Sequence, residues 1–280
     1  MAEQKIAILG GKGMLGSDLV LACQKHSFEA TALDLPSFDI TNTDHIRQVV
    51  KKAQIIVNCA AYTDVEKAES QPDLAYKVNA EAVANLGSLA KDSGIWVLHI
   101  STDFVFDGTS ERPYVETDTP NPINVYGASK LAGEKLLIES SCSNCIMRVE
   151  WTYGLNGNNL VTKLINRAKN KKELAVVDDQ IGSPTATTEV AEAICTLVRK
   201  KPEGLFHFAG SGYASRFETA KFIFDRLDMQ VNLTSCKTSD YKTAAKRPLN
   251  SRFCCDKIQA LLAEPIKHWQ KPLEKFLERI

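Results

Sequence analysis

Two residues with acid–base chemistry lie four positions apart in VYGASKLAGEKLL, residues 125–137: Tyr126 and Lys130. Residues four apart share one face of an α-helix, so a helical segment would bring the Lys130 ammonium beside the Tyr126 phenol. A nearby cation favours the phenolate and lowers a tyrosine pKa, which suits proton exchange near neutral pH. Because this spacing also arises by chance, the alternative is an amphipathic helix without catalytic function.

A glycine-rich turn follows the first apolar run in KIAILGGKGMLGSDLV, residues 5–20. The glycines fit GxxGxxG at Gly10, Gly13 and Gly16, or GxGxxG with Gly11 in first place. We prefer the first register because Gly10 directly follows the apolar run, where the chain must turn. Glycine lets the backbone approach a pyrophosphate, which the amino terminus of the next helix then stabilises. The motif predicts a dinucleotide site, with a ligand-free glycine turn as the alternative.

Asp34 closes the second apolar run, EATAL. A carboxylate at that strand end can accept hydrogen bonds from an adenosine ribose and repel a 2′-phosphate, which favours NADH over NADPH. The alternative is a cap of a loop or helix. We expect Asp39 and Ile40 near the adenine, although Asp39 equally fits the cap of the next helix.

Short apolar, β-branched runs alternate with helical stretches through the first half of the chain. The runs are residues 5–9, 29–33, 54–58, 95–101 and 144–148. This alternation predicts an α/β fold with a Rossmann-type doubly wound parallel sheet. Beyond Arg148 the pattern predicts strands at 173–177 and 204–208, a helix between them at 187–200, and further helices at 215–227 and 274–280.

The two halves of the chain suggest two units. We assign residues 1–150, plus roughly 187–208, to a dinucleotide-binding Rossmann domain. Residues 151–186 and 209–280 are expected to form a smaller carboxyl-terminal substrate-binding lobe over the strand ends, where open α/β sheets bind ligands.

Charge and composition exclude several classes of function. With 34 basic and 34 acidic residues, the formal net charge is zero, so no long-range field favours nucleic acid or an anionic membrane. Neither a signal peptide nor a membrane-spanning run is evident, and we expect a cytoplasmic protein. The eight cysteines are expected as reduced thiols, and Cys142 with Cys145 lacks the second close pair of a zinc site, so we predict no metal ligands.

Thr102 lies in HISTDFVFDG, at the end of the fourth apolar run and ahead of the Tyr126 segment. Both segments can face a nicotinamide laid across the sheet edge. Thr102 can donate a hydrogen bond to a substrate carbonyl oxygen, which gains charge as hydride reaches its carbon. In this setting Tyr126 becomes a general acid, and the sequence predicts a reductase.

These stretches resemble the extended short-chain dehydrogenase/reductases and, more narrowly, the dTDP-4-dehydrorhamnose reductase family. The likeness runs nearly end to end, through GGKGMLG, NCAAYTDVEKAES, VNAEAV, STDFVFDG, NVYGASKLAGEK, RVEWTYG, DDQIGSPT and KRPLNSR. The glycine loop and YxxxK are shared across the superfamily. A much narrower set of proteins shares AAYTDVEKAE, DDQIGSPT and KRPLNSR. The resemblance implies NADPH- or NADH-dependent reduction of the C4 ketone of a nucleotide-linked 4-keto-6-deoxyhexose. With dTDP-4-dehydro-L-rhamnose the product is dTDP-L-rhamnose, a precursor of cell-surface polysaccharide.

The resemblance also implies residue roles. The expected catalytic residues are Thr102, Asp103, Tyr126 and Lys130. The expected cofactor contacts are Gly10, Gly13, Met14, Leu15, Gly16, Asp34, Asp39, Ile40, Ala60, Ala61, Tyr62, Asn79, Tyr126 and Lys130. The expected substrate contacts are Val65, Glu66, Thr102, Asp103, Tyr126, Trp151 and Arg247. An aromatic ring suits the C–H face of a sugar and arginine suits a diphosphate. The alternatives are a core role for Trp151, a solvated helix charge for Glu66 and a surface ion pair for Arg247.

Several alternatives stay open at this point. Cys59 and Phe104 stand where the family commonly shows alanine and tyrosine, and Cys59 could alter cofactor preference. The resemblance leaves room for a bound Mg²⁺ and for a homodimer. The competing functions are a regulatory nucleotide-binding subunit of a partner enzyme and a reductase for a different nucleotide sugar.

Overall fold

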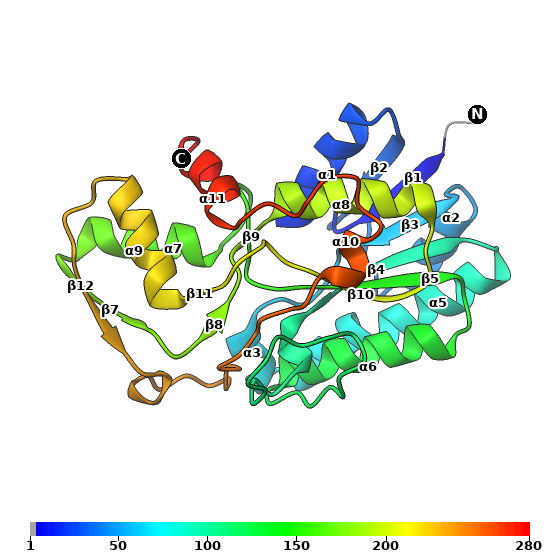
Figure 1. Ribbon diagram of the computed structural model, residues 1–280. Coiled ribbons are helices and arrows are strands. Elements are labelled where there is room, and N and C mark those ends of the chain that lie inside the picture. Colours follow the sequence, from blue (N-terminus) through cyan, green and yellow to red (C-terminus); the bar gives the residue numbers. More distant parts are fainter. Residues whose placement is uncertain (1–3) are drawn as a thin grey trace.

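The computed structural model describes residues 4–280, in which helices cover both faces of a central parallel sheet (Figure 1). The sheet order is β10-β5-β4-β3-β1-β2, and every neighbouring pair is parallel. Its strands are β1 (Lys5–Leu9), β2 (Glu29–Leu33), β3 (Ile55–Asn58), β4 (Trp96–Thr102), β5 (Asn144–Val149) and β10 (Gly204–Phe208). The predicted Rossmann-type α/β fold is confirmed.

The strand sequences explain their places in the sheet. β3 reads IIVN and is buried throughout, and β4 reads WVLHIST and is almost entirely buried, as expected for strands covered on both faces. β2, EATAL, lies at the sheet edge and is half exposed.

Two apolar layers hold the helices on the two faces of the sheet. One face packs against α1 (Met14–Lys25) and α8 (Thr187–Lys200), through residues such as Leu19 and Ile194. The other face packs against α2 (Thr43–Val50), α5 (Ala82–Asp92) and α6 (Val125–Glu139). Between β3 and α5 the chain forms α3 (Val65–Ser70), α4 (Pro72–Tyr76) and the π-helical turn η1 (Lys77–Glu81).

A separate apolar cluster lies at the other end of the molecule, where α7, α9, β7 and β12 gather in Figure 1. Leu164, Phe224 and Leu273 belong to its core. Its elements are α7 (Leu160–Asn170), β7 (Glu173–Val177), α9 (Arg216–Arg226), β12 (Asn232–Cys236) and α11 (Gln270–Leu277). The predicted strand at 173–177 is present, and it pairs in parallel with β12, which the sequence pattern did not reveal.

Short elements connect the two clusters. β6 (Thr152–Tyr153) pairs with β9 (Thr185–Ala186), and β8 (Ile181–Gly182) pairs with β11 (Ala214–Ser215). The rest are the 3-10 turns η2 (Asp103–Val105) and η3 (Thr238–Asp240) and the helix α10 (Asp256–Gln259). The chain therefore crosses between the clusters several times.

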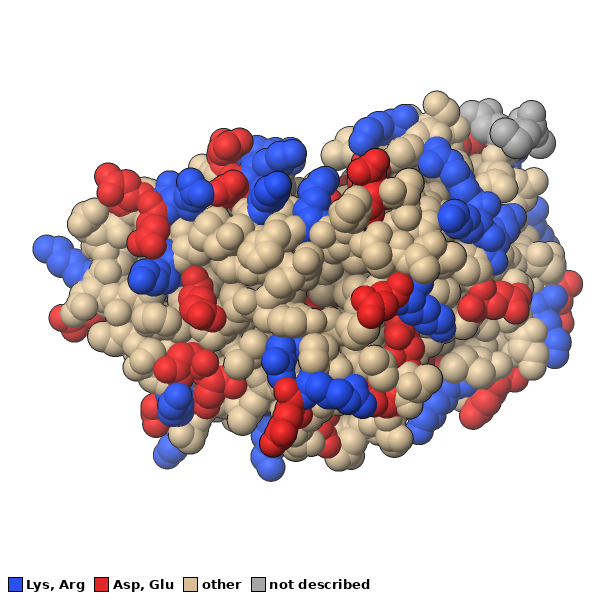
Figure 2. Space-filling view, in the orientation of Figure 1, with Lys and Arg blue, Asp and Glu red and all other residues tan. Residues whose placement is uncertain are grey.

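The surface carries both signs of charge. Figure 2 shows Lys and Arg interspersed with Asp and Glu over the visible face, in line with the zero net charge. Of the helices between residues 4 and 280, none has the length and apolar character needed to cross a membrane. Residues 1–3 of the predicted first domain lie outside the described residues.

Candidate active site

The glycine turn lies where the sheet topology reverses. β2 and β3 flank β1 on opposite sides, and open α/β sheets bind ligands at the strand ends of such a point. Gly10 follows β1 with φ +74°, a left-handed conformation that favours glycine, and a Cβ there would lie 2.7 Å from the Ala60 backbone nitrogen. The preferred register, which places Gly10 at the tight turn, fits this geometry.

Helix α1 starts close against this turn. A Cβ at Gly16 would overlap the Gly10 carbonyl oxygen, so only glycine permits this approach. Gly13 is the N-cap residue and no side chain caps α1. The first N–H groups of the helix are therefore available to an anion.

The predicted acid–base pair lies on α6, with both residues facing the strand ends. Asn124 caps this helix by accepting from the Gly127 N–H at 2.8 Å. Lys130 is buried, and its ammonium donates to the Ile100 carbonyl oxygen at 2.7 Å and lies 3.3 Å from His99 Nε2. The carboxyl end of β4 therefore positions the lysine.

The electrostatics of the pair differ from the prediction. We expected an ammonium that lowers the tyrosine pKa, but burial raises the pKa of Tyr126 to about 12, with the Thr102 hydroxyl opposing the shift. Among residues 4–280, no hydrogen bond joins Lys130 to Tyr126, because the ammonium is directed to Ile100 and His99. Burial also lowers the pKa of Lys130 to about 8.

Thr102 and Asp103 form a small polar cluster beside Tyr126. The Thr102 hydroxyl donates to Asp103 Oδ1 at 3.0 Å and accepts from the Phe104 N–H at 3.2 Å. Asp103 Oδ2 accepts from the Ser251 hydroxyl at 2.6 Å. Burial raises the pKa of Asp103, while the Ser251 and Thr102 hydroxyls oppose that rise.

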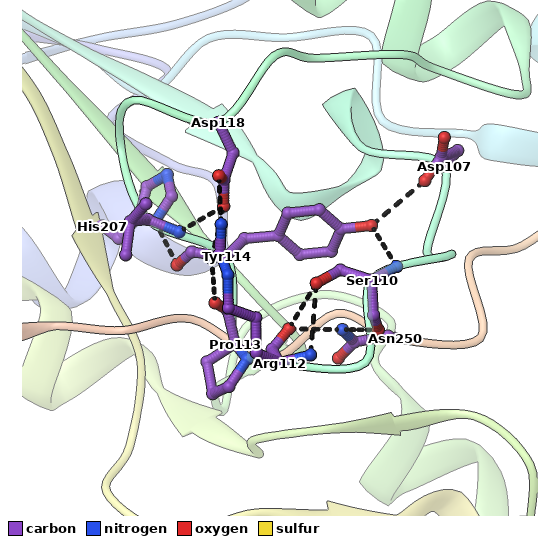
Figure 3. A network of polar contacts seen from close by, with 9 residues as sticks. Asp107, Ser110, Arg112, Pro113, Tyr114, Asp118, His207 and Asn250 are labelled. Atoms are coloured by element: carbon purple, nitrogen blue, oxygen red, sulfur yellow. Dashed lines mark hydrogen bonds and ion pairs between the residues drawn. The ribbon is translucent and has the colours of Figure 1, made fainter.

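The segment that carries Ser251 is fixed by the loop after β4 (Figure 3). The Asn250 amide donates to the carbonyl oxygens of Ser110 at 2.7 Å and Arg112 at 2.9 Å. Arg112 in turn binds both carboxylate oxygens of Asp118, at 2.9 and 2.6 Å. This network holds the returning chain against the end of β4.

Two cavities meet at the strand ends. We call the first the turn cavity: it has a volume of about 790 Å³ and is bounded by Gly10, Asp34 and Tyr126. The second, the lobe cavity, has about 450 Å³ and is bounded by Leu160, Val176 and Tyr241. The residues that line both are Val65, Trp151, Thr152, Asn158 and Arg216. The cavities therefore adjoin, and a ligand can extend from one to the other.

Comparison with known proteins agrees with this arrangement. The family model described as the RmlD substrate binding domain matches residues 4–280. The chain belongs to this family. It is 35% identical over 287 residues to the dTDP-4-dehydrorhamnose reductase of Sinorhizobium fredii, an alignment that covers 98% of this chain and 96% of the relative.

Two further RmlD-family comparisons are informative. The crystal structure of dTDP-4-dehydrorhamnose reductase from Bacillus anthracis in complex with NADP has a TM-score of 0.95, with 36% identity over 99% of this chain and 100% of that one. The dTDP-4-keto-6-deoxy-D-glucose reductase of Streptomyces niveus is 34% identical over 270 residues, covering 95% of this chain and 94% of the relative.

Most site residues expected from the RmlD-family resemblance lie together. Those that line the turn cavity are Gly10, Gly13, Met14, Leu15, Asp34, Asp39, Ile40, Ala60, Ala61, Tyr62, Val65, Thr102, Asp103, Tyr126, Lys130 and Trp151. Gly16 and Asn79 do not line it. Asn79 is buried, accepts from the Tyr62 N–H at 2.8 Å and donates to Ser129 Oγ at 3.0 Å, so it shapes the loop behind the cavity.

Two acidic residues of the turn cavity, Asp34 and Asp39, have backbone partners. Asp34 accepts from the N–H groups of Lys12 and Leu35, both at 2.8 Å, so it also fixes the glycine turn. Asp39 accepts from the Thr41 N–H at 2.8 Å. The alternative of Asp39 as a helix cap is wrong, because Asn42 caps α2.

The expected substrate residues other than Thr102, Asp103 and Tyr126 divide into two groups. Val65, Trp151 and Arg247 line the lobe cavity. Glu66 lines neither cavity and pairs with Arg247 at 2.5 Å. Glu66 is therefore a partly exposed charge on the first turn of α3 that is held in an ion pair, and the alternative of an ion pair for Arg247 fits the structure.

The sequence prediction missed Ser251 and Arg216. Arg216 covers a face of Trp151, with its guanidinium carbon 3.4 Å from the ring centroid. The available signal was the capping box SRFE, because Ser215 and Glu218 cap each other at the start of α9 and put Arg216 at its first position. Nothing in the local pattern indicated that Ser251 would meet Asp103.

The Mg²⁺ suggested by the resemblance has no support in the described residues. Between residues 4 and 280, no group of three or more His, Cys, Asp or Glu side chains is placed to hold a metal ion. Cys142 and Cys145 are free thiols.

Proposed function

We propose that this chain is a nicotinamide-dependent reductase of the C4 ketone in a nucleotide-linked 4-keto-6-deoxyhexose. We take the substrate as dTDP-4-dehydro-L-rhamnose and the product as dTDP-L-rhamnose, and the name of the relative from S. fredii, dTDP-4-dehydrorhamnose reductase, supports this choice. The observation that carries the proposal is the meeting of Thr102, Tyr126 and Lys130 in the cavity that also contains the glycine turn. Membership of the RmlD family supports it.

The turn cavity fits a dinucleotide. The uncapped start of α1 and the glycine turn suit a pyrophosphate, and Asp34 suits a ribose. The chemistry that such a cofactor supplies when bound is hydride transfer. Asp39 and Ile40 would then lie on the adenosine side.

The protein's own residues protonate the ketone oxygen and stabilise the negative charge that develops on it. A pKa of about 12 keeps the Tyr126 phenol protonated at neutral pH, so it can give its proton to the oxygen as the alcohol forms. The Thr102 hydroxyl, which donates to Asp103 in this structure, can rotate to donate its hydrogen bond to the same oxygen as it gains negative charge. The charged form of Lys130 then stabilises the phenolate that remains.

We propose that NADH is used at least as well as NADPH, on the ground that Asp34 lines the turn cavity. The relative from B. anthracis binds NADP, which supports use of the phosphorylated cofactor as well. The Lys12 ammonium lies 3.4 Å from the Leu35 carbonyl oxygen, so a cation flanks Asp34 and offsets part of its repulsion.

The predicted division into a cofactor domain and a substrate lobe is part of this proposal. Its support is the separation of the apolar layers around the central sheet from the cluster around Leu164 and Phe224. A homodimer and a cytoplasmic location stay predictions.

A reductase for a different sugar is the second candidate, and the S. niveus relative favours it, since its name places it on dTDP-4-keto-6-deoxy-D-glucose. A regulatory subunit would not require Thr102, Tyr126 and Lys130 to share one cavity. Their meeting favours catalysis.

The test is turnover of purified protein with dTDP-4-keto-6-deoxyhexoses. We expect oxidation of NADH or NADPH with the wild type, and NMR of the product sugar gives the C4 configuration. Tyr126→Phe keeps the ring and removes the proton donor, so kcat should fall by ~10²-fold to 10⁴-fold. Absence of turnover with every such sugar would contradict the proposal.

A further inference from the structure

Arg216 lies where the turn cavity meets the lobe cavity, and it lines both. It is the first residue of α9, and its guanidinium stacks on the ring of Trp151. Trp151 itself follows the end of β5 in a left-handed conformation, with φ +46°. The stack fixes a planar cation at the junction of the two cavities.

The guanidinium donors of Arg216 have no partner in the described part of the chain, whereas its backbone N–H donates to the Gln180 carbonyl oxygen at 3.2 Å. Among residues 4–280, no hydrogen bond or ion pair engages its guanidinium. The two carboxyl groups that influence it have other partners: Asp103 binds Ser251, and Glu150 accepts from the N–H groups of Ser183 and Phe253 at 3.0 and 3.3 Å. Burial lowers the pKa of Arg216 to about 9, which leaves it charged at neutral pH. A partly buried cation with free donors at a cavity junction fits an anionic ligand.

The guanidinium of Arg247, unlike that of Arg216, already has partners within the protein. One of its terminal nitrogens pairs with Glu66 at 2.5 Å, and the other donates to the Ala245 carbonyl oxygen at 3.3 Å. Its charge is therefore already compensated. The resemblance assigned the diphosphate to Arg247, but Arg216 has the uncompensated charge.

The lining of the lobe cavity also favours an anion. Its charged residues are Lys163, Arg167, Arg216 and Arg247, and no Asp or Glu of the described chain lines it. In a nucleotide sugar the diphosphate joins the sugar to the nucleoside. A sugar beside Tyr126 and a nucleoside in the lobe cavity would place that diphosphate at the junction, beside Arg216.

We infer that Arg216 binds the diphosphate of the nucleotide-sugar substrate and, through its stack on Trp151, holds the indole at the sugar end of the site. This inference rests on the proposed function. It makes Arg216 a substrate-binding residue and leaves proton transfer to Tyr126.

The experiment compares Arg216→Met and Arg216→Lys with the wild type. The inhibition constants of dTDP, dTMP and thymidine are measured against the nucleotide sugar. Loss of a charge-assisted contact should raise the dTDP constant roughly 10-fold to 100-fold in Arg216→Met, with little change for thymidine. Arg216→Lys should recover part of the loss, because the charge is kept without the planar fork.

Arg226→Met is the matched control. Arg226 lies on the same helix and also covers an aromatic ring, that of Phe222, but it pairs with Glu274 and lines neither cavity. This variant should leave the dTDP constant unchanged. The dissociation constant of NADPH and the melting temperature are measured for each variant, and Arg216→Lys serves if Arg216→Met does not fold.

Direct contact is separated from an effect through the indole by a double-mutant cycle with Trp151→Ala. If Arg216 contacts the diphosphate, its substitution should still weaken dTDP in the Trp151→Ala background. Loss of the effect there, or equal weakening of dTDP and thymidine, would overturn the inference. Unchanged dTDP binding in Arg216→Met with an active wild type would also overturn it, whereas an inactive wild type would count against the proposed function instead.

Discussion

The Ser251 hydroxyl donates a 2.6 Å hydrogen bond to Asp103, which lies 148 positions earlier in the chain. Asp103 in turn accepts from Thr102. The segment near residue 250, which the network of Figure 3 holds in place, therefore reaches the oxygen-binding side of the proposed active site.

Ser251→Ala should lower kcat about fivefold, because a buried hydrogen bond to a charged or polar group is worth ~1 kcal/mol or more and its loss frees Asp103 to reorient. Its effect on the dissociation constant of NADPH should be small. Ser143→Ala is the control, since Ser143 also donates to a carboxylate, Glu203, but at the surface. A similar kcat in both variants would show that Asp103 does not depend on Ser251.

The activity should have an alkaline limb near pH 8. Burial lowers the pKa of Lys130 to about 8, so its ammonium loses the proton as pH rises through that value. If the charge stabilises the phenolate of Tyr126, kcat/KM falls above pH 8. Lys130→Arg keeps its charge to higher pH, so the limb should disappear even though the overall rate is lower. An unchanged limb in Lys130→Arg would assign it to another group.

The same lysine should affect stability in the opposite direction. An unfolded lysine has a pKa of about 10.4, so between about pH 8 and 10.4 the unfolded chain binds more protons at this position than the folded protein. The contribution of Lys130 to the free energy of unfolding therefore rises with pH in that window. Urea denaturation of wild type and Lys130→Met across the window measures the difference, and parallel curves would contradict the depressed pKa.

Gly16→Ala should weaken cofactor binding and destabilise the protein by about 1 to 3 kcal/mol, because the added Cβ overlaps the Gly10 carbonyl oxygen and pushes α1 away from the turn. Calorimetric titration with NADPH and thermal unfolding measure the two effects. Gly94→Ala is the control: its φ of +64° also makes alanine unfavourable, yet a Cβ there meets nothing within 4 Å. That variant should keep the wild-type affinity for NADPH.

Asp34→Asn should shift cofactor preference towards NADPH by about 1 to 2 kcal/mol, or roughly 5-fold to 30-fold in the ratio of kcat/KM values. The amide oxygen can still accept from the Lys12 N–H, which holds the glycine turn, while the charge and the acceptor of the Leu35 N–H are lost. Lys12→Ala should shift the ratio the other way. An unchanged ratio of kcat/KM values for the two cofactors in both variants would show that Asp34 and Lys12 do not determine cofactor preference.

The sequence predicted the central sheet because its signals are local. Strands such as β1 and β3 are short apolar runs bounded by helical stretches, and both are found as predicted. β12 was missed because NLTSC is polar and half exposed, and only its pairing with β7 makes it a strand.

The site residues likewise divide into those that local sequence motifs predicted and those that they did not. Gly10, Thr102 and Tyr126 belong to local motifs whose strand or helix already fixes their position. Arg216 and Ser251 acquire their roles only when distant segments pack together. The hydrogen bond from Lys130 to Ile100 was not predicted, because helical spacing shows which residues share a face, whereas the direction of a side chain depends on the acceptors of the neighbouring strand.

Cys59 ends up beside these groups, directly after β3 and within the turn cavity. Burial raises the pKa of its thiol to about 12, although Lys130 opposes the shift. Alkylating agents and peroxides react with the thiolate form of cysteine. At neutral pH this form is almost absent when the thiol pKa is raised in this way. Although it lines the turn cavity, Cys59 should therefore react slowly with such agents, and the protein should tolerate oxidants that inactivate enzymes with an exposed, acidic thiol.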